Sequence, residues 1–229
     1  MNLSTVVHGL RPGLEAFLNF LYPPVCVICK SCPDAGQKLV CQNCWSNLPL
    51  DRPVAHDPAT RGELQEIRSV WQFSEEVQTV IHELKYHSKK SLSKRFGCEM
   101  AVLLLRTPAY AEADLLMPVP LHQTRFRERG FNQSLLLCQA ISSHTGMPVE
   151  SQVLRRTKHT GPQAKLSATE RERNVATAFQ VVDAGALKCK SIIVVDDVLT
   201  TGATLRACAA ALRRAGATRI FGLTAARTP

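Results

Sequence analysis

One stretch, Ser191 to Thr204, limits what this chain can fold into more than any other part of the sequence. It reads S-I-I-V-V-D-D-V-L-T-T-G-A-T. The run from Ile192 to Val195 is apolar and mostly β-branched, which is typical of a strand buried on both faces of a parallel sheet. Two adjacent aspartates follow, then a loop of small hydroxyl residues with one glycine, then apolar residues at helical spacing. The stretch therefore predicts a strand closed by two acids, a loop and a helix, in that order.

This order of elements suits a phosphorylated sugar. A helix start offers unpaired N–H groups and the positive end of a dipole, so an anion binds there without a dedicated basic residue. Gly202 lets the backbone approach a phosphate, and the threonine hydroxyls add donors. Asp196 and Asp197 only accept hydrogen bonds, so they suit sugar hydroxyls or a bound metal ion. The alternative, a buried strand and turn with capping aspartates, leaves the sequence T-T-G-A-T unexplained.

With 229 residues, the chain has room for one large domain and a small appendage. A segment rich in proline and polar residues, Asp51 to Gly62, marks the expected boundary. We therefore expect an N-terminal helix and a cysteine-rich module over residues 1–60 and the main domain over residues 61–229. The net charge of +9 favours polyanionic partners, such as nucleic acid or pyrophosphate-bearing ligands.

The N-terminal segment is expected to form an amphipathic helix. Its apolar residues, from Leu10 to Leu21, are interrupted by Arg11 and Glu15, so no run is long enough to cross a bilayer. The segment also lacks the basic start and continuous apolar core of a signal peptide. We therefore expect a cytoplasmic protein without a membrane span, in which cysteines bind metal rather than form disulfides.

Two C-x-x-C pairs, Cys26 with Cys29 and Cys41 with Cys44, are separated by eleven residues. Two such pairs complete the tetrahedral shell of a structural zinc ion, and four thiolates leave no open position for a catalytic water. Cys32 also forms a C-x-x-C pair with Cys29, and we leave it as a spare thiol. Buried or redox-active cysteines are the alternative.

Two basic segments are candidates for anion binding. Asp114 to Leu121 reads as a short strand, and a loop with three arginines, including Arg125 and Arg129, follows it before a helix capped by Asn132. Guanidinium groups there would grip pyrophosphate or phosphodiester oxygens, with ordinary surface charge as the alternative. The stretch from Leu154 to Asn174 reads as a long basic loop and a short helix, a candidate lid.

The remaining elements are expected as strands at Ser69–Phe73, Phe179–Val182 and Thr218–Ala225, with helices between them. The helix that includes Leu84 ends in basic residues, beginning with Lys85. Their charge is favoured by the helix dipole, and a nucleic-acid patch is the alternative.

Four blocks together resemble one protein family. They are the C-x-x-C pairs, P-V-P-L-H-x-x-R-x-x-x-R-G-F-N-Q at Pro118 to Gln133, T-x-x-Q-x-x-L-S-x-x-E-R-x-x-N at Thr160 to Asn174, and V-V-D-D-V-L-T-T-G-A-T. The last resembles the phosphoribosyl pyrophosphate (PRPP) motif of type I phosphoribosyltransferases. Over essentially its full length the chain is similar to the ComF/GntX family of competence and DNA-utilization proteins. The resemblance implies an α/β fold, an open and mainly parallel sheet flanked by helices, with a small N-terminal zinc finger of four cysteines.

The resemblance also implies roles for individual residues. Asp196 and Asp197 would hold the ribose hydroxyls of PRPP with Mg²⁺. The 5′-phosphate would bind at Val198, Leu199, Thr200, Thr201, Gly202, Ala203 and Thr204. Candidates for pyrophosphate or DNA are Arg125, Arg129, Thr160, Gln163 and Arg171. No general base is identified; Asp197 and Lys158 are candidates.

Three functions remain open at this point. The chain is expected to bind PRPP and act in uptake, processing or nutritional use of DNA, as a phosphoribosyltransferase with an unknown acceptor. Alternatively it is a non-enzymatic adaptor for single-stranded DNA, with PRPP as a structural or regulatory ligand and competence or DNA-processing proteins as partners. The third and weakest is a PRPP-responsive regulator.

Overall fold

The computed structural model describes residues 25–33, 39–54, 57–60, 62–86, 91–157 and 177–229. The chain packs as two compact units, Met1–Leu48 and Pro49–Pro229. The first unit includes the short helix α2 (Gln42–Ser46). The expected N-terminal amphipathic helix lies outside the described residues, and the expected boundary after residue 60 stays a prediction. Within the described residues, no helix is long and apolar enough to cross a membrane.

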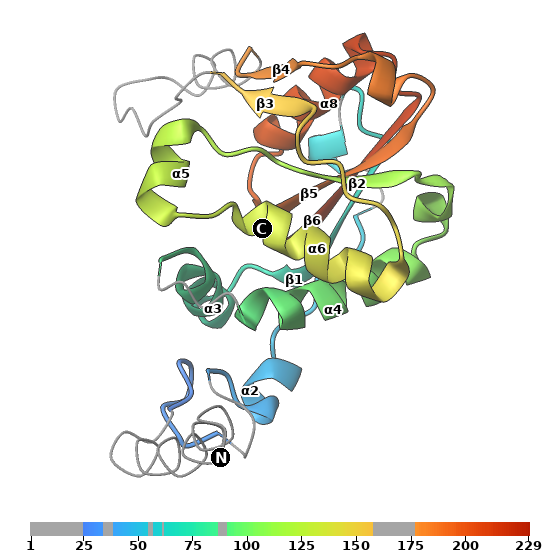
Figure 1. The fold of residues 1–229 in the computed structure, drawn as a ribbon. Helices are drawn as coiled ribbons and strands as arrows, with labels where there is room; N and C mark the ends of the chain where they lie inside the picture. Colours follow the sequence, from blue (N-terminus) through green and yellow to red (C-terminus); the bar gives the residue numbers. More distant parts are fainter. Residues whose placement is uncertain (1–24, 34–38, 55–56, 61, 87–90, 158–176) are drawn as a thin grey trace, which may run out of the picture. The chain divides into compact units, whose positions relative to one another are not determined.

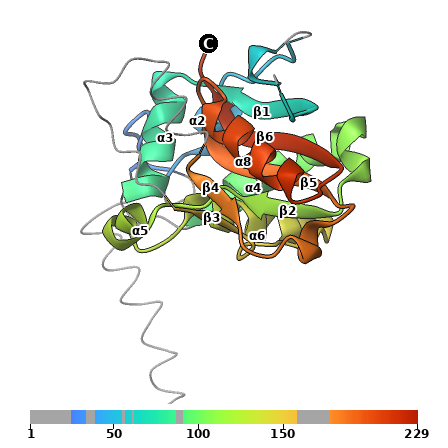
Figure 2. The same cartoon turned by 90° about the horizontal axis from the view of Figure 1, so that it is seen from above.

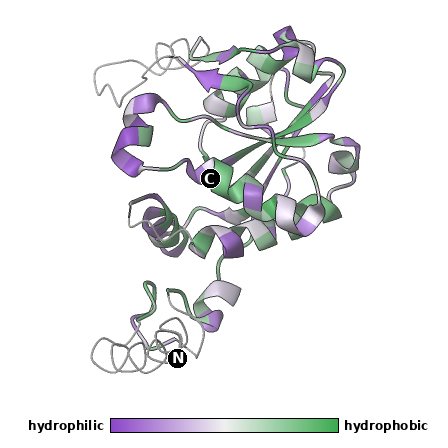
Figure 3. Ribbon diagram, viewed as in Figure 1, coloured by the Kyte–Doolittle hydropathy of each residue, from purple (hydrophilic) through white to green (hydrophobic). Residues whose placement is uncertain are grey.

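The second unit is built on a four-stranded sheet with the order β1-β6-β5-β2 (Figure 1). Its strands are β1 (Glu66–Gln72), β2 (Leu115–Pro118), β5 (Ser191–Leu199) and β6 (Arg219–Arg227). All three strand pairs are parallel. The strands are predominantly hydrophobic (Figure 3), as expected for a sheet that is covered on both faces. The fold class expected from the sequence, an open parallel sheet flanked by helices, is confirmed.

Strand β5 is longer than the apolar run in the sequence indicated. It was expected to close at the two aspartates, but its pairing with β6 continues through them to Leu199, which lies opposite Arg227. The extension is possible because β6 runs equally far beside it and supplies partners for the backbone. Asp196 and Asp197 therefore sit on ordered sheet rather than on a loop.

Helices cover the two faces of the sheet differently. On one face lie α4 (Ser91–Arg106) and α6 (Gln133–Thr145), with α3 (Glu75–Tyr86) beside α4. On the other face α8 (Ala203–Arg214) crosses β5 and β6 (Figure 2). α4 and α6 pack closely because Gly97 has no side chain: a Cβ there would lie 2.2 Å from the Cβ of Ala140. This contact fixes the position of α6, which carries part of the site.

A second, antiparallel sheet consists of β3 (Leu154–Arg156) and β4 (Phe179–Val181). The expectation of a loop beginning at Leu154 was wrong for its first three residues, because they pair with β4. The rest of the candidate lid, including Lys158, Thr160, Gln163 and Arg171, falls within residues 158–176 and outside the described part. Three short helices also belong to this unit: η1 (Pro58–Thr60), η2 (Pro108–Glu112) and η3 (Gly185–Leu187).

Candidate functional site

The carboxyl ends of β2 and β5 lie side by side at one edge of the sheet. The two strands are neighbours in the sheet, yet the chain leaves β2 toward α6 on one face and leaves β5 toward α8 on the other. Open α/β sheets bind ligands at such a switch in direction, because the two connections part and expose the strand ends. Asp196 and Asp197 lie at this end of β5.

Asp196 connects β5 with α6 at this end of the sheet. Its Oδ1 accepts hydrogen bonds from the Ser134 hydroxyl of α6, at 2.9 Å, and from the backbone N–H of Asp197, at 2.9 Å. Its Oδ2 accepts none from the residues that the structure describes. Burial and the adjacent charge of Asp197 raise the pKa of Asp196 to about 7. A partly exposed carboxylate with one unused oxygen is suited to a sugar hydroxyl or a divalent cation.

Asp197 points to a different partner. Its side chain is only 7% exposed, and its Oδ2 lies 2.5 Å from the Nζ of Lys85, from the last turn of α3. Its Oδ1 accepts the backbone N–H of Val198 at 3.0 Å. Lys85 therefore serves as the counter-ion of a buried acid, a role that neither sequence alternative, helix dipole or nucleic-acid patch, included.

The loop after β5 leads directly into α8. Thr200 and Thr201 are exposed, Gly202 is buried, and Ala203 and Thr204 are partly buried. Gly202 has a φ of 74°, a left-handed conformation that favours glycine. A Cβ there would lie 2.7 Å from the Cβ of Ala59, so both the conformation and the space require glycine. The first amides of α8 are thereby presented next to two exposed hydroxyls, as an anion site requires.

The arginines after β2 lie on a short helix, so the expectation of a loop was wrong. This helix, α5 (Gln123–Arg129), begins where His122 accepts the N–H of Thr124 and ends at Gly130, whose φ is 76°. Arg125 pairs with Glu128 at 3.3 Å, and Arg129 donates to Gln133 at 2.5 Å. The two arginines singled out from the sequence thus have protein partners. Arg127 has no such partner among the described residues.

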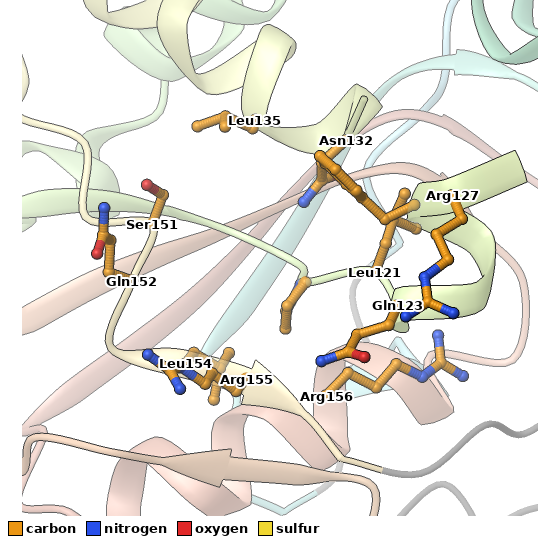
Figure 4. A pocket seen from close by; sticks show the side chains of 12 residues that line it. Leu121, Gln123, Arg127, Asn132, Leu135, Ser151, Gln152, Leu154, Arg155 and Arg156 are labelled. Atoms are coloured by element: carbon orange, nitrogen blue, oxygen red, sulfur yellow. The ribbon is translucent and has the colours of Figure 1, made fainter. Parts of the chain in front are cut away.

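An open pocket of about 680 Å³ lies between the chain after β2, the start of α6 and strand β3. Figure 4 shows Arg127 and Arg156 reaching toward each other from opposite walls, with Gln123 between them. Burial lowers the pKa of Arg156; the proximity of Cys208 and Asp196 opposes this shift, and the positive charge of Arg125 adds to it. Arg156 therefore lies in the lining of the pocket and also interacts electrostatically with Asp196.

The first unit contains the expected cysteine cluster. The sulfurs of Cys26, Cys29, Cys41 and Cys44 all lie within 4.8 Å of one another, and those of Cys29 and Cys41 are 3.8 Å apart. Thiolates about 2.3 Å from a tetrahedral zinc ion lie about 3.8 Å apart, so the four residues fit zinc.

Other groups of this unit support the thiolates. The backbone N–H of Cys41 donates to the sulfur of Cys26, and that of Cys44 donates to the sulfur of Cys41. Hydrogen bonds from the side chain and backbone of Ser31 lower the pKa of Cys29 to about 6. Cys32 is outside the cluster, and its sulfur lies 3.7 Å from the carbonyl oxygen of Pro33.

Sequence reasoning missed Lys85, Ser134 and Arg156 as site residues. For Lys85 and Arg156, only the basic character of the side chain could be observed in the sequence, and many surface residues share it. Ser134 lies directly after the G-F-N-Q block, but nothing in its type indicated a bond to an acid 62 positions away. The contact exists only because α6 and β5 are adjacent in the fold.

Comparison with protein families matches both units. The model of the double zinc ribbon domain matches residues 17–61, and the model of the phosphoribosyl transferase domain matches residues 133–226. The structural zinc site and the phosphoribosyltransferase-like domain expected from the sequence are both supported.

This chain is similar to two curated relatives and to one solved structure. The DNA utilization protein YhgH of Escherichia coli O157:H7 is 32% identical over 203 residues, covering 84% of this chain and 87% of that protein. Competence protein F of Haemophilus influenzae is 36% identical over 50% of this chain and 51% of that protein. A glutamine PRPP amidotransferase structure from B. subtilis is 25% identical with a TM-score of 0.42, covering 62% of this chain and 30% of that chain.

Proposed function

Because the chain belongs to the ComF/GntX family of competence and DNA-utilization proteins, we propose that its phosphoribosyltransferase-like domain binds PRPP with Mg²⁺. The protein acts in the cytoplasm in the uptake, processing or nutritional use of DNA. One observation carries the proposal. The carboxylate of Asp196, with one oxygen free of hydrogen bonds to described residues, lies at the end of β5 next to β2, and the N-terminal amides of α8 follow it in the same segment.

In this proposal each part of the segment binds one part of the ligand. Asp196 accepts hydrogen bonds from the ribose hydroxyls through its accessible oxygen, and Asp197, buried against Lys85, adds negative charge beside it. The amides and hydroxyls from Val198 to Thr204 bind the 5′-phosphate. Bound Mg²⁺ would supply positive charge to the pyrophosphate as it departs. Transfer requires a nucleophile to form a bond to the anomeric carbon while pyrophosphate leaves and the nucleophile loses its proton.

Titration calorimetry with Mg-PRPP tests the binding step. Wild type should bind, and Asp196→Asn and Asp197→Asn should each weaken binding by about tenfold or more, because a charged acceptor is lost. Asp183→Asn removes the same charge from an exposed turn outside the site and should bind as wild type does. Equal affinity in all four proteins would refute the proposal.

A second assay separates the enzyme from the adaptor. Release of pyrophosphate from PRPP is measured with a panel of bases, nucleosides and DNA ends as acceptors. Release with one acceptor class supports transfer. PRPP binding without release supports the alternative, a single-stranded DNA adaptor for which PRPP is a regulatory ligand, and its DNA affinity must fall steeply with salt.

A further inference from the structure

The pocket between the chain after β2, α6 and β3 combines two kinds of lining that PRPP binding does not require together. One part is apolar and includes Leu121, Leu135 and Leu154. The other part is cationic and includes Arg127, Arg155 and Arg156. The volume of about 680 Å³ is within the range of small-molecule sites and much larger than pyrophosphate alone needs.

Two of these cations, Arg127 and Arg155, are available to an external anion. The side chains of Arg127 and Arg155 make no ion pair or hydrogen bond with any residue in the described part of the chain, in contrast to those of Arg125 and Arg129. Arg127 comes from α5 and Arg156 from β3, and Figure 4 shows their guanidinium groups facing each other across the pocket. Two guanidinium groups that face each other are suited to grip one phosphate from both sides, because each presents a planar fork of donors.

The apolar part offers a surface to a planar group. Phe126, on the same helix as Arg127, is 51% exposed, an unusual state for a large aromatic side chain. Exposed aromatic rings stack on nucleobases, and every base presents a π-face. A free base would leave the arginines unused, and an inorganic anion would leave the apolar surface unused.

From these two halves we propose that the pocket binds a nucleotide, a planar base joined to a phosphate. The phosphate lies between Arg127 and Arg156, and the base lies against Phe126 and the leucines. The nucleotide is either free or one unit of a single strand. The inference rests on the proposed function, since the nucleotide is the second ligand beside the PRPP site, but it is tested without PRPP.

The probe is a dye-labelled, 5′-phosphorylated thymidine pentanucleotide, and its binding is followed by fluorescence anisotropy without PRPP or Mg²⁺. Thymidine monophosphate, thymidine and inorganic pyrophosphate are the competitors. We expect the monophosphate to compete about tenfold or more better than either of the others, because only it uses both halves of the pocket. If unlabelled pentanucleotide competes far better than the monophosphate, the site takes a strand; equal competition indicates a free nucleotide.

Three variants locate the binding. Arg127→Gln and Phe126→Ala should each lower the affinity for the probe by about tenfold. The first variant loses a contact to the phosphate, and the second loses a contact to the base. Both side chains are exposed, so the fold is expected to persist. Arg214→Gln removes an exposed arginine from the last turn of α8 and should bind as wild type does. Calorimetric binding of Mg-PRPP should be unchanged in all three.

Two results would overturn the inference: pyrophosphate competing as well as the monophosphate, or Arg127→Gln binding the probe like Arg214→Gln. Failure of the proposed function has a different signature. In that case wild type does not bind Mg-PRPP, while the nucleotide still binds and still depends on Arg127.

Discussion

Asp196 and Asp197 are neighbours in the sequence but differ in exposure and in partners. Asp196 is partly exposed and keeps one oxygen free of protein hydrogen bonds among the described residues, whereas Asp197 is buried against Lys85. Alternation along a strand sends successive side chains to opposite faces of the sheet, which explains the difference. The D-D pair in the sequence therefore contains two chemically distinct groups.

The first prediction concerns the pH dependence of stability. Burial and the charge of Asp197 raise the pKa of Asp196 to about 7. Between about pH 4 and about pH 7 the folded protein keeps a proton that the unfolded chain has released, so this group's contribution to stability falls as pH rises. We expect urea unfolding of wild type, relative to Asp196→Asn, to show declining stability from about pH 4 to about pH 7.

The comparison with Asp196→Asn isolates this carboxyl. The groups facing it, including Asp197, Lys85, Cys138, Cys208 and Arg156, are present in both proteins, so their own titration largely cancels. Parallel pH profiles of the two proteins would contradict the raised pKa.

The second prediction concerns Lys85. Lys85→Met leaves the buried carboxylate of Asp197 without its counter-ion, and we expect it to lower the free energy of unfolding by about 2–4 kcal/mol. Urea denaturation measures the loss. In Lys190→Met the broken pair with Asp114 is exposed and spans 3.7 Å, so the loss should stay below about 1 kcal/mol. Adding Asp197→Asn to Lys85→Met should recover part of the stability; similar losses in the two single variants would argue against a buried pair.

At the scale of elements, α5 and α8 show how local signals and tertiary space combine. The residues His122 and Gly130 delimit α5, and its three arginines are good helix formers, yet the sequence analysis expected a loop here. The T-T-G-A-T segment indicated the loop before α8 correctly. The need for glycine there comes partly from Ala59, which lies far away in sequence.

The third prediction concerns the contact between Gly202 and Ala59. Gly202→Ala and Gly130→Ala both place alanine at a positive φ, which costs about 1–2 kcal/mol. A Cβ at Gly130 meets nothing within 4 Å, whereas at Gly202 it overlaps Ala59. Thermal unfolding should therefore show a further loss of about 1–3 kcal/mol for Gly202→Ala alone. The same variant should bind Mg-PRPP more weakly, while Gly130→Ala should not. Equal unfolding temperatures would contradict the overlap.

At the scale of the whole molecule, the chain combines two units with different sources of stability. The second unit has a parallel sheet with apolar cores on both faces. The first is small and holds four thiols in zinc geometry. Small modules of this kind obtain much of their folding free energy from the metal.

The fourth prediction follows from this division. Cys44→Ser should lose bound zinc, measured by atomic absorption, whereas Cys32→Ser should retain it, because the sulfur of Cys32 is outside the cluster. Neither change should shift the main urea transition of the second unit, whose core contains none of these cysteines. Loss of zinc in Cys32→Ser would show that the ligand set is wrong.

Short-range patterns in the sequence were sufficient for the zinc ligands and the strand–loop–helix segment from Ser191 to Thr204, and the resemblance of four such blocks to one family implied the fold class. Each of these depends on residues close together in the chain, where spacing alone specifies geometry. The salt bridge from Lys85 to Asp197, the bond from Ser134 to Asp196 and the facing arginines of the pocket could not be predicted. They arise because packing brings together side chains from elements that are distant in sequence, and single residues carry no record of which distant partner they meet.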